Sequence, residues 1–207
     1  MVHKITLLRH GLSVGNKKGI IQGQMDFPLS DEGSEQAHSL LHYWKQHNVC
    51  FDVIVSSPLL RAKQTADIIS SGMDLPIELD ATWCERQSGK AEGRPYAEVK
   101  LKYSDQPHDT PYDPLFETGE SRWDIYIRAA NSMQVLVRRP AGAYLVVSHG
   151  AILGAAIHTV LGIPPVQGRI QPIRIGFNNT GYAVLEYDGG ESRWWLHRLN
   201  ATCHLAQ

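Results

Sequence analysis

The chain contains 207 residues, with 20 Lys and Arg against 21 Asp and Glu, which gives a formal net charge of -1. A hydrophobic fraction of 43% and five tryptophans are enough for a sizeable core, so the composition excludes a largely disordered chain. The balanced charge argues against a general binder of nucleic acid or acidic membranes, because such proteins usually carry a basic excess. A chain of this length usually forms one domain, and we expect a single domain over residues 1–207.

The cysteines and the N-terminal segment indicate a cytoplasmic protein. Cys50, Cys84 and Cys203 are odd in number and form no C-x-x-C pair, so we expect three reduced thiols. The first apolar run is short and ends in Arg-His, unlike a signal peptide, and no run approaches the ~18 apolar residues of a membrane span. We therefore expect neither nucleic acid nor a membrane as partner.

The first half of the chain predicts strands that alternate with amphipathic helices. In chain order we expect a strand over 2–8, a loop rich in Gly, Asn and Ser to residue 30, a helix over 30–47, a strand over 51–57, a helix over 58–70 and a strand over 75–79. Ser30 is the expected N-cap of the first helix, which has acidic residues in its first turn.

The second half continues the alternation and ends in a hairpin. The expected elements are a weak helix over 96–103, a loop insertion over 104–119, a helix over 121–137, a strand over 143–148, a helix over 149–162, and strands over 181–187 and 192–199 joined by a turn at 188–190. Such alternation predicts an α/β three-layer sandwich, in which a mainly parallel central sheet carries helices on both faces.

Histidine and arginine follow three of the predicted strands. One strand ends in Arg9-His10-Gly11, and another in Ser148-His149-Gly150, where a helix begins. Arg61 lies in the first turn after a third strand. Ligands of open α/β sheets bind at the carboxyl ends of strands, glycine lets the backbone approach a ligand, and a helix start favours anions. Together these residues predict a site for a phosphate dianion.

Four separated motifs carry a resemblance to a known family. They are LLRHGLSVGN, SSPLLRAKQTA, CERQSGKAEG and VVSHG. In this order and spacing they resemble the histidine phosphatase superfamily, which also contains the cofactor-dependent phosphoglycerate mutases. The resemblance runs from Ile5 to the last residues. One departure is Leu12, where relatives often carry Glu or Gln after the RHG motif.

The resemblance implies a role for each matching residue. His10 is the implied nucleophile that accepts the phosphoryl group, and Glu85 the acid that protonates the leaving oxygen and later helps to activate water. The rest of the implied phosphate pocket is Arg9, Arg61, His149 and Asn16.

This chemistry sets requirements for the surroundings of His10. The imidazole must be neutral at its attacking nitrogen, so a backbone carbonyl in the glycine turn is expected to hold the other nitrogen. Nearby guanidinium groups favour the neutral form, because like charges lower a histidine pKa. They also stabilise the transferring phosphoryl group, so we expect neither a metal nor another cofactor.

Phosphatase, mutase and silent binding protein remain the three alternatives. The short chain, Glu92-Gly93, the Gly119-Glu120-Ser121 run and the C-terminal FNNTGYAVLEYDGG resemble the phosphatases. Glu85-Arg86 with Gly89 also fits the mutases. A silent regulatory member would be expected to lack the nucleophile, an arginine or the acid, and none is missing. Hydrolysis of a small phosphate monoester is the favoured interpretation.

The sequence leaves the substrate's identity open. The residues expected to bind it are Asn16, Gln22, Gly23, Gly150 and Arg86. Other candidates for the leaving-group side are Phe27, Trp83, Arg94, Tyr96, Tyr112 and Phe116, of which Trp83 and Tyr96 fit a core position equally well. The oligomeric state also stays open, a homodimer included.

Overall fold

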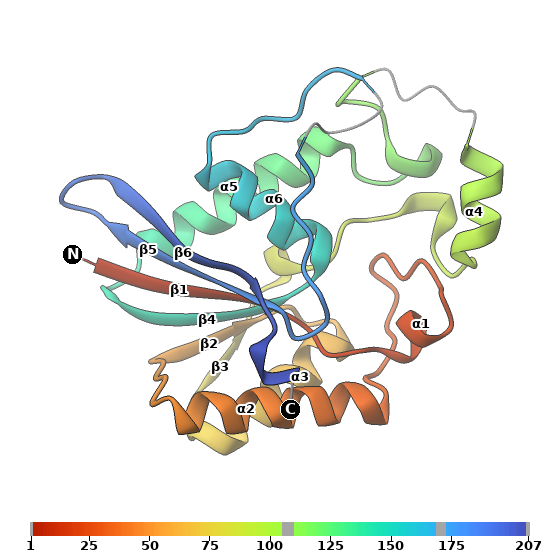
Figure 1. Cartoon of the computed structure of the whole chain (residues 1–207). Coiled ribbons are helices and arrows are strands. Elements are labelled where there is room, and N and C mark those ends of the chain that lie inside the picture. Colours follow the sequence, from red (N-terminus) through yellow and green to blue (C-terminus); the bar gives the residue numbers. More distant parts are fainter. Residues whose placement is uncertain (1, 105–109, 169–172, 206–207) are drawn as a thin grey trace.

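A computed structural model describes residues 2–104, 110–168 and 173–205. Six strands form one sheet in the order β3-β2-β4-β1-β5-β6 (Figure 1). The strands are β1 (Val2–Arg9), β2 (Val53–Ser56), β3 (Ile77–Leu79), β4 (Gly142–Ser148), β5 (Tyr182–Asp188) and β6 (Arg193–Ala201). Neighbours among β3, β2, β4 and β1 are parallel, whereas β5 is antiparallel to β1 and β6 to β5. The predicted α/β class is confirmed, and its sheet is mixed because the C-terminal hairpin extends one edge.

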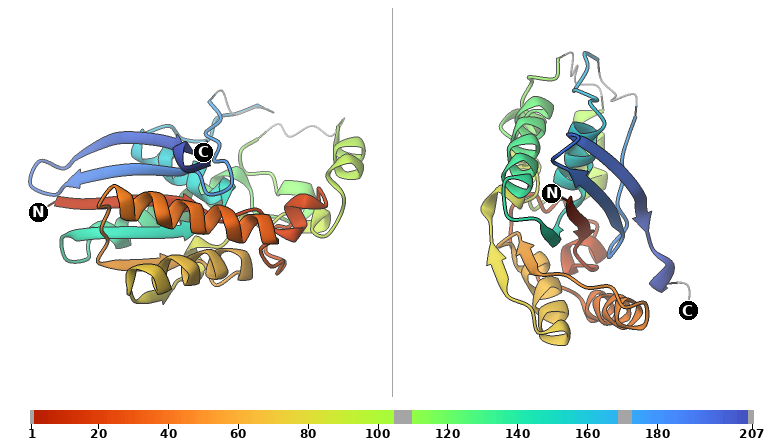
Figure 2. Two further views of the ribbon diagram at one scale, coloured as in Figure 1. Left: turned by 60° about the horizontal axis from the view of Figure 1, so that its bottom comes forward. Right: turned by 90° about the vertical axis from the view of Figure 1, so that its left-hand side faces the viewer.

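Helices cover both faces of this sheet (Figure 2). Helices α2 (Asp31–Gln46) and α3 (Leu60–Met73) lie on one face, and α5 (Arg122–Val137) and α6 (Gly150–Val160) on the other. Two short helices, α1 (Val14–Lys17) and α4 (Tyr96–Tyr103), stand beyond the carboxyl ends of the parallel strands. The layers therefore leave that end of the sheet to loops.

The central strands explain why the core is divided into two layers. Successive side chains of a strand point to opposite faces. Ile5 and Leu7 pack in the cluster with α5 and α6, while Leu8 packs in the cluster with α2 and α3. Val146 and Val147 of β4 divide in the same way. A strand buried on both faces favours consecutive apolar residues, as in Leu7-Leu8 of β1 and Leu145-Val146-Val147 of β4.

The structure differs from the sequence prediction in the first loop. Residues 14–17 form α1 because Ser13 caps it, with the Ser13 side chain accepting from the Asn16 N–H and the Asn16 side chain accepting from the Ser13 N–H. The expected cap Ser30 does accept from the Gly33 N–H at 3.1 Å. In the predicted loop over 104–119, residues 105–109 lie outside the described residues, and Leu115–Glu117 form a 3₁₀ turn.

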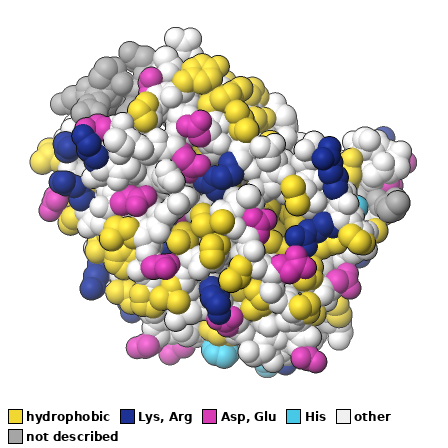
Figure 3. Space-filling model, turned by 180° about the vertical axis from the view of Figure 1, so that it is seen from behind, with side chains coloured by type: hydrophobic (Ala, Val, Ile, Leu, Met, Phe, Trp, Pro, Cys, Tyr) yellow, Lys and Arg dark blue, Asp and Glu magenta, His cyan; other side chains and the backbone are white. Residues whose placement is uncertain are grey.

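The surface carries both signs of charge. Basic and acidic side chains are interspersed over the face shown in Figure 3, in keeping with the net charge of -1. Within the described ranges, no helix is long and apolar enough to cross a membrane. Cys50 and Cys203 are exposed and Cys84 is buried, and all three are free.

Candidate active site

The carboxyl ends of three neighbouring strands bring the predicted catalytic residues together. In the sheet β4 lies between β2 and β1, so the residues that follow these strands share one edge. The rings of His10 and His149 lie with centroids 5.1 Å apart. His10 lines a cavity of about 290 Å³, whereas His149 is fully buried and is not part of its lining. The lining of this cavity includes Arg9, His10, Asn16, Gln22, Gly23, Arg61, Glu85 and Arg86.

The imidazole of His10 is held in one tautomer. Its Nδ1 lies 2.7 Å from the carbonyl oxygen of Gly11, and because a carbonyl only accepts, Nδ1 carries the proton. The other nitrogen, Nε2, then keeps its lone pair. Burial lowers the pKa of His10 well below its ordinary value, and the guanidinium groups of Arg9 and Arg61 lower it further. The expected neutral form thus has burial as its first cause.

Arg9, which is half-buried, and Arg61, which is buried, each leave one buried donor atom unused. Arg9 donates from Nη1 to the carbonyl of Phe177 at 2.6 Å, and Arg61 donates to the carbonyls of Met25 and Gly23, both at 2.9 Å. The Nε–H of each guanidinium is buried and has no hydrogen-bond partner among the described residues. An unpaired buried donor is costly, so these two positions favour an anionic acceptor.

His149 is buried and leaves one ring nitrogen without a partner. Its Nε2 lies 2.8 Å from Ser57 Oγ, while Nδ1 is buried with no partner in the described part of the chain. Burial lowers its pKa well below the ordinary value, and Arg61 adds to the effect. His149 is therefore neutral, like His10.

Glu85 occupies the helix start that the sequence assigned to the substrate's phosphate. The backbone N–H of Ala151, in the first turn of α6, lies 3.1 and 3.3 Å from the two carboxylate oxygens. The Arg86 N–H donates to the same carboxylate at 2.8 Å. The expected anion site at this helix start thus holds a side chain of the protein, because a fixed carboxylate stabilises the positive end of the helix.

The loop that contains α1 closes another side of the cavity. Ser13 Oγ lies 2.9 Å from Asn16 Oδ1 and 2.7 Å from Gln22 Oε1, which leaves the amide nitrogens of both side chains available as donors. Gly23 has a φ of +49°, and a side chain there would overlap Glu92. A glycine is therefore required at this turn.

Comparison with known proteins settles the family. The profile of the histidine phosphatase superfamily (branch 1) matches residues 5–202. The chain belongs to this superfamily. It is 31% identical over 202 residues to "Uncharacterized phosphatase PhoE" of Bacillus subtilis, which covers 98% of this chain and 96% of that protein. It is 30% identical over 209 residues to "Probable phosphoglycerate mutase GpmB" of Yersinia enterocolitica, with 98% and 94% covered.

Solved structures of similar proteins agree with this assignment. Bacillus stearothermophilus YhfR has a TM-score of 0.83 and 25% identity, over 98% of this chain and 99% of that one. Mycobacterial glucosyl-3-phosphoglycerate phosphatase has a TM-score of 0.78 and 26% identity, over 97% and 100%. Phosphoserine phosphatase of Entamoeba histolytica has a TM-score of 0.77 and 27% identity, over 98% and 99%. As a member of this superfamily, the chain is a phosphatase or a mutase.

The glycines of two superfamily motifs differ in what their surroundings require, because only Gly11 serves close packing. A side chain at Gly11 would overlap the carbonyl of Gly33, so Gly11 lets the strand end pack on the start of α2. At Gly150 the nearest atom to an added Cβ would be Arg9 Nε at 3.7 Å, an ordinary contact. Gly150 lines a neighbouring cavity and is absent from the lining of the phosphate pocket.

The neighbouring cavity, of about 450 Å³, shares Arg9, Arg86 and Ala151 with the phosphate pocket. Of the leaving-group candidates, Arg86 lines both cavities, whereas Trp83 is buried in the core and Phe116 packs on Tyr103. Phe27, Arg94, Tyr96 and Tyr112 line neither cavity. The contributions of α5, of Ile163 and Pro165 and of residues 173–177 were not expected from the sequence. Arg174, a charged residue between two isoleucines, is the feature of the sequence that could have indicated this cavity.

Proposed function

We propose that this member of the superfamily is a phosphomonoester hydrolase that acts through a phosphohistidine on a small phosphorylated metabolite. The main support is the state of His10, whose Nδ1 is held by the Gly11 carbonyl at 2.7 Å while two buried arginine Nε–H groups beside it lack partners. The phosphatase names of several similar proteins agree with it. We further propose that the enzyme works in the cytoplasm and needs no metal.

In the first step, the lone pair of His10 Nε2 attacks phosphorus. The N–P bond forms while the P–O bond to the leaving group breaks, and the leaving oxygen takes a proton from Glu85. Glu85 must therefore enter this step protonated. Arg9 and Arg61 donate their free Nε–H groups to phosphoryl oxygens and stabilise the transition state, the work that a metal ion does elsewhere.

We assign His149 the role of a neutral donor. Ser57 Oγ lies 2.8 Å from Nε2, and a hydroxyl that donates to Nε2 leaves the proton of the neutral ring on Nδ1. Nδ1 is the buried atom without a partner, so this tautomer supplies one more N–H to the phosphoryl group. Ser57 thus acts as a positioning residue for His149.

In the second step, water enters where the leaving group stood. Glu85, now a carboxylate, takes a proton as the water oxygen attacks phosphorus. The electron pair of the N–P bond returns to Nε2, and inorganic phosphate leaves. His10 is again neutral with its proton on Nδ1, and Glu85 is again protonated.

A mutase is the second candidate, because a similar protein of Yersinia enterocolitica carries that name. A mutase would return the phosphoryl group from His10 to a reoriented phosphoglycerate. Its turnover of phosphoglycerates would depend on added bisphosphoglycerate. Hydrolysis of 3-phosphoglycerate that is indifferent to added bisphosphoglycerate would favour the hydrolase.

The deciding experiment measures release of phosphate from 4-nitrophenyl phosphate in the presence of EDTA. Wild-type protein should turn the compound over, His10→Ala should abolish turnover, and His38→Ala, an exposed histidine on α2, should leave it unchanged. Quenching with labelled substrate should trap a phosphoenzyme that is stable in alkali and lost in acid. An alkali-labile adduct on a carboxylate, or binding of phosphate without turnover, would overturn the proposal.

A further inference from the structure

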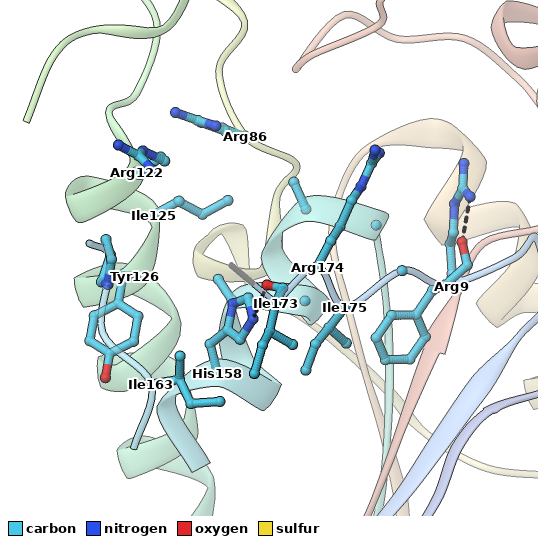
Figure 4. Close-up of a pocket in the computed structure, with 17 residues that line it drawn as sticks. Arg9, Arg86, Arg122, Ile125, Tyr126, His158, Ile163, Ile173, Arg174 and Ile175 are labelled. Carbon is cyan, nitrogen blue, oxygen red and sulfur yellow. Dashed lines mark hydrogen bonds between the residues drawn. The ribbon is translucent and has the colours of Figure 1, made fainter. Parts of the chain in front are cut away.

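The 450 Å³ cavity beside the phosphate pocket lies between α5, α6 and the segment over 173–177, and Ile163 and Pro165 also line it (Figure 4). It is larger than the phosphate pocket, and the two share lining residues. Cavities of a few hundred Å³ suit small organic ligands. A substrate bound in both cavities would place its phosphate beside His10 and the rest of the molecule here.

The position of Glu85 decides which end of the substrate enters this cavity. Its carboxylate is held on the Ala151 N–H, and Ala151 lines both cavities. The group that protonates the leaving oxygen must lie within hydrogen-bond reach of it. Glu85 itself lines only the phosphate pocket, so a leaving group that stays near it and passes Ala151 enters the larger cavity.

Besides Arg9, three arginines line the larger cavity, and one of them, Arg86, also lines the phosphate pocket. In Figure 4 the guanidinium groups of Arg86 and Arg122 lie close together, and Arg174 extends along the same side of the cavity, between this pair and Arg9. Arg122 donates from Nη2 to the Gly168 carbonyl at 2.6 Å, but its Nη1 is buried without a partner among the described residues. Burial lowers the pKa of Arg86 to about 10 against the attraction of Glu120 and Glu85, and repulsion from Arg122 adds to the lowering.

The carboxylates near these arginines are already engaged. Glu120 pairs with Arg128 at 2.7 Å, and Asp124 accepts from the N–H and hydroxyl of Ser121. In the described parts of the chain, no carboxylate forms an ion pair with Arg86, Arg122 or Arg174. This side of the cavity thus offers guanidinium donors to an anion that the protein does not itself supply.

The rest of the larger cavity's lining is mostly apolar. It includes Ile125, Ile163, Ile173, Ile175, Gly154 and Ala155. Gly154 allows the segment to approach α6, because a Cβ there would lie 2.7 Å from the Ile175 carbonyl oxygen. An uncharged stretch of ligand gains from burial on such a surface, whereas a charge placed there would be unpaired.

We propose that the substrate is a phosphate monoester whose leaving group carries both an apolar part and a second anionic group, a carboxylate or another phosphate. Arg86, Arg122 and Arg174 bind that second group. The inference rests on the proposed function and adds to it the class of the leaving group.

The test compares kcat/KM for ω-phosphooxyalkanoates of increasing length with alkyl phosphates of the same length. A remote carboxylate leaves the reactivity of the phosphate ester unchanged, so the ratio reports binding at the far end. We expect the acid to be preferred at least about tenfold, since a charged hydrogen bond contributes that much, with a maximum at one chain length. A parallel series of alkanediol bisphosphates distinguishes a phosphate from a carboxylate as the preferred group.

Variants locate the preference in the arginines. Arg122→Gln and Arg174→Gln should each lower the ratio of acid to alkyl ester about tenfold, because each removes a charged donor. Arg138→Gln, at the exposed opposite end of α5, makes the same change of charge and should leave the ratio as it is. Arg174 is exposed, so its variant carries the test even where Arg122→Gln fails to fold.

The outcomes separate this inference from the proposed function. Turnover of both series with a ratio near one at every length overturns the inference and leaves the hydrolase intact. A preference for the acid that survives in Arg174→Gln and in folded Arg122→Gln also overturns it. Failure of the wild-type protein to hydrolyse any compound, 4-nitrophenyl phosphate included, overturns the proposed function itself.

Discussion

The two adjoining cavities are built from different kinds of segment. The phosphate pocket stands at the ends of β1, β2 and β4, and backbone carbonyls fix the side chains of His10 and Arg61. The larger cavity lies between two helices and an irregular segment. Residues on strand ends are fixed by the sheet, whereas loops can change without loss of the fold. We therefore expect the first cavity to treat every phosphate ester alike and the second to discriminate among leaving groups.

Replacing Arg61 should give the largest effect and the same effect for every substrate. Arg61→Ala removes a charge that stabilises the transferring phosphoryl group, so kcat/KM should fall about 1000-fold for aryl and alkyl phosphates alike. Arg61→Lys keeps the charge but loses the Nε–H, so its kcat/KM should fall less than that of Arg61→Ala. Lys63→Ala, two residues further along α3 with a side chain that is 43% exposed and pairs with Asp67, is the control. A loss confined to one class of substrate would contradict the comparison.

Replacing Glu85 should give an effect that depends on the leaving group. Glu85→Gln keeps an oxygen for the Ala151 N–H but has no acidic proton. We expect kcat/KM to fall about 100-fold or more for alkyl phosphates, which need the proton, and less than about tenfold for 4-nitrophenyl phosphate, whose phenolate leaves without it. This parameter covers events up to departure of the leaving group, so the second step does not mask the difference. Equal losses would remove Glu85 from the role of acid.

A smaller, uniform effect is expected at Ser57. Ser57→Ala frees His149 to change tautomer, so kcat/KM should fall about tenfold for all substrates, the worth of one hydrogen bond to a phosphoryl oxygen. Ser57→Thr, which keeps the hydroxyl, should recover most of the activity. The ¹⁵N chemical shifts of His149 should show the proton on Nδ1 in the wild-type protein and a mixture in Ser57→Ala. An unchanged tautomer would refute the positioning role.

The phosphate pocket could be predicted from sequence because its parts lie at strand ends. His10, Arg61 and His149 follow apolar runs that read clearly as strands, and parallel strands bring their carboxyl ends to one edge. The tautomer of His10 was likewise expected, since a glycine turn places a carbonyl within reach. Sequence reasoning gave too little weight to burial as the cause of the lowered pKa of His10.

The larger cavity could not be predicted, because the residues that line it follow no periodic pattern in the sequence. Arg174 and Ile175 lie in an irregular segment whose position depends on packing against α6, and Arg122 is one charged residue in a helix. Trp83 and Tyr96 were better candidates by residue type, yet Trp83 is buried in the core and Tyr96 is 62% exposed outside both cavities. The helix start at Ala151 was read as a substrate site because sequence alone does not show that Glu85 reaches it.

The smallest expected effect concerns stability and a histidine far from the substrate. Thr180 donates its N–H to the carbonyls of Arg9 and His10, and its hydroxyl, which donates to Asn179, accepts from His204 Nε2 at 2.8 Å. Burial lowers the pKa of His204 to about 4. The unfolded chain binds a proton at this residue near pH 6.5, so the folded state loses stability as the pH falls from 6.5 through 4.

His204→Gln tests this linkage, because glutamine can donate to Thr180 but does not titrate in this range. Denaturant unfolding between pH 7.5 and 4.5 should show the wild-type protein losing stability faster than the variant, by no more than about 1.4 kcal/mol per pH unit for one proton. The exposed His38→Gln should follow the wild type. Because His10 and His149 are also buried and neutral, the variant should still lose some stability in acid. Parallel curves for wild type and His204→Gln would show that His204 takes up its proton equally well in the folded state.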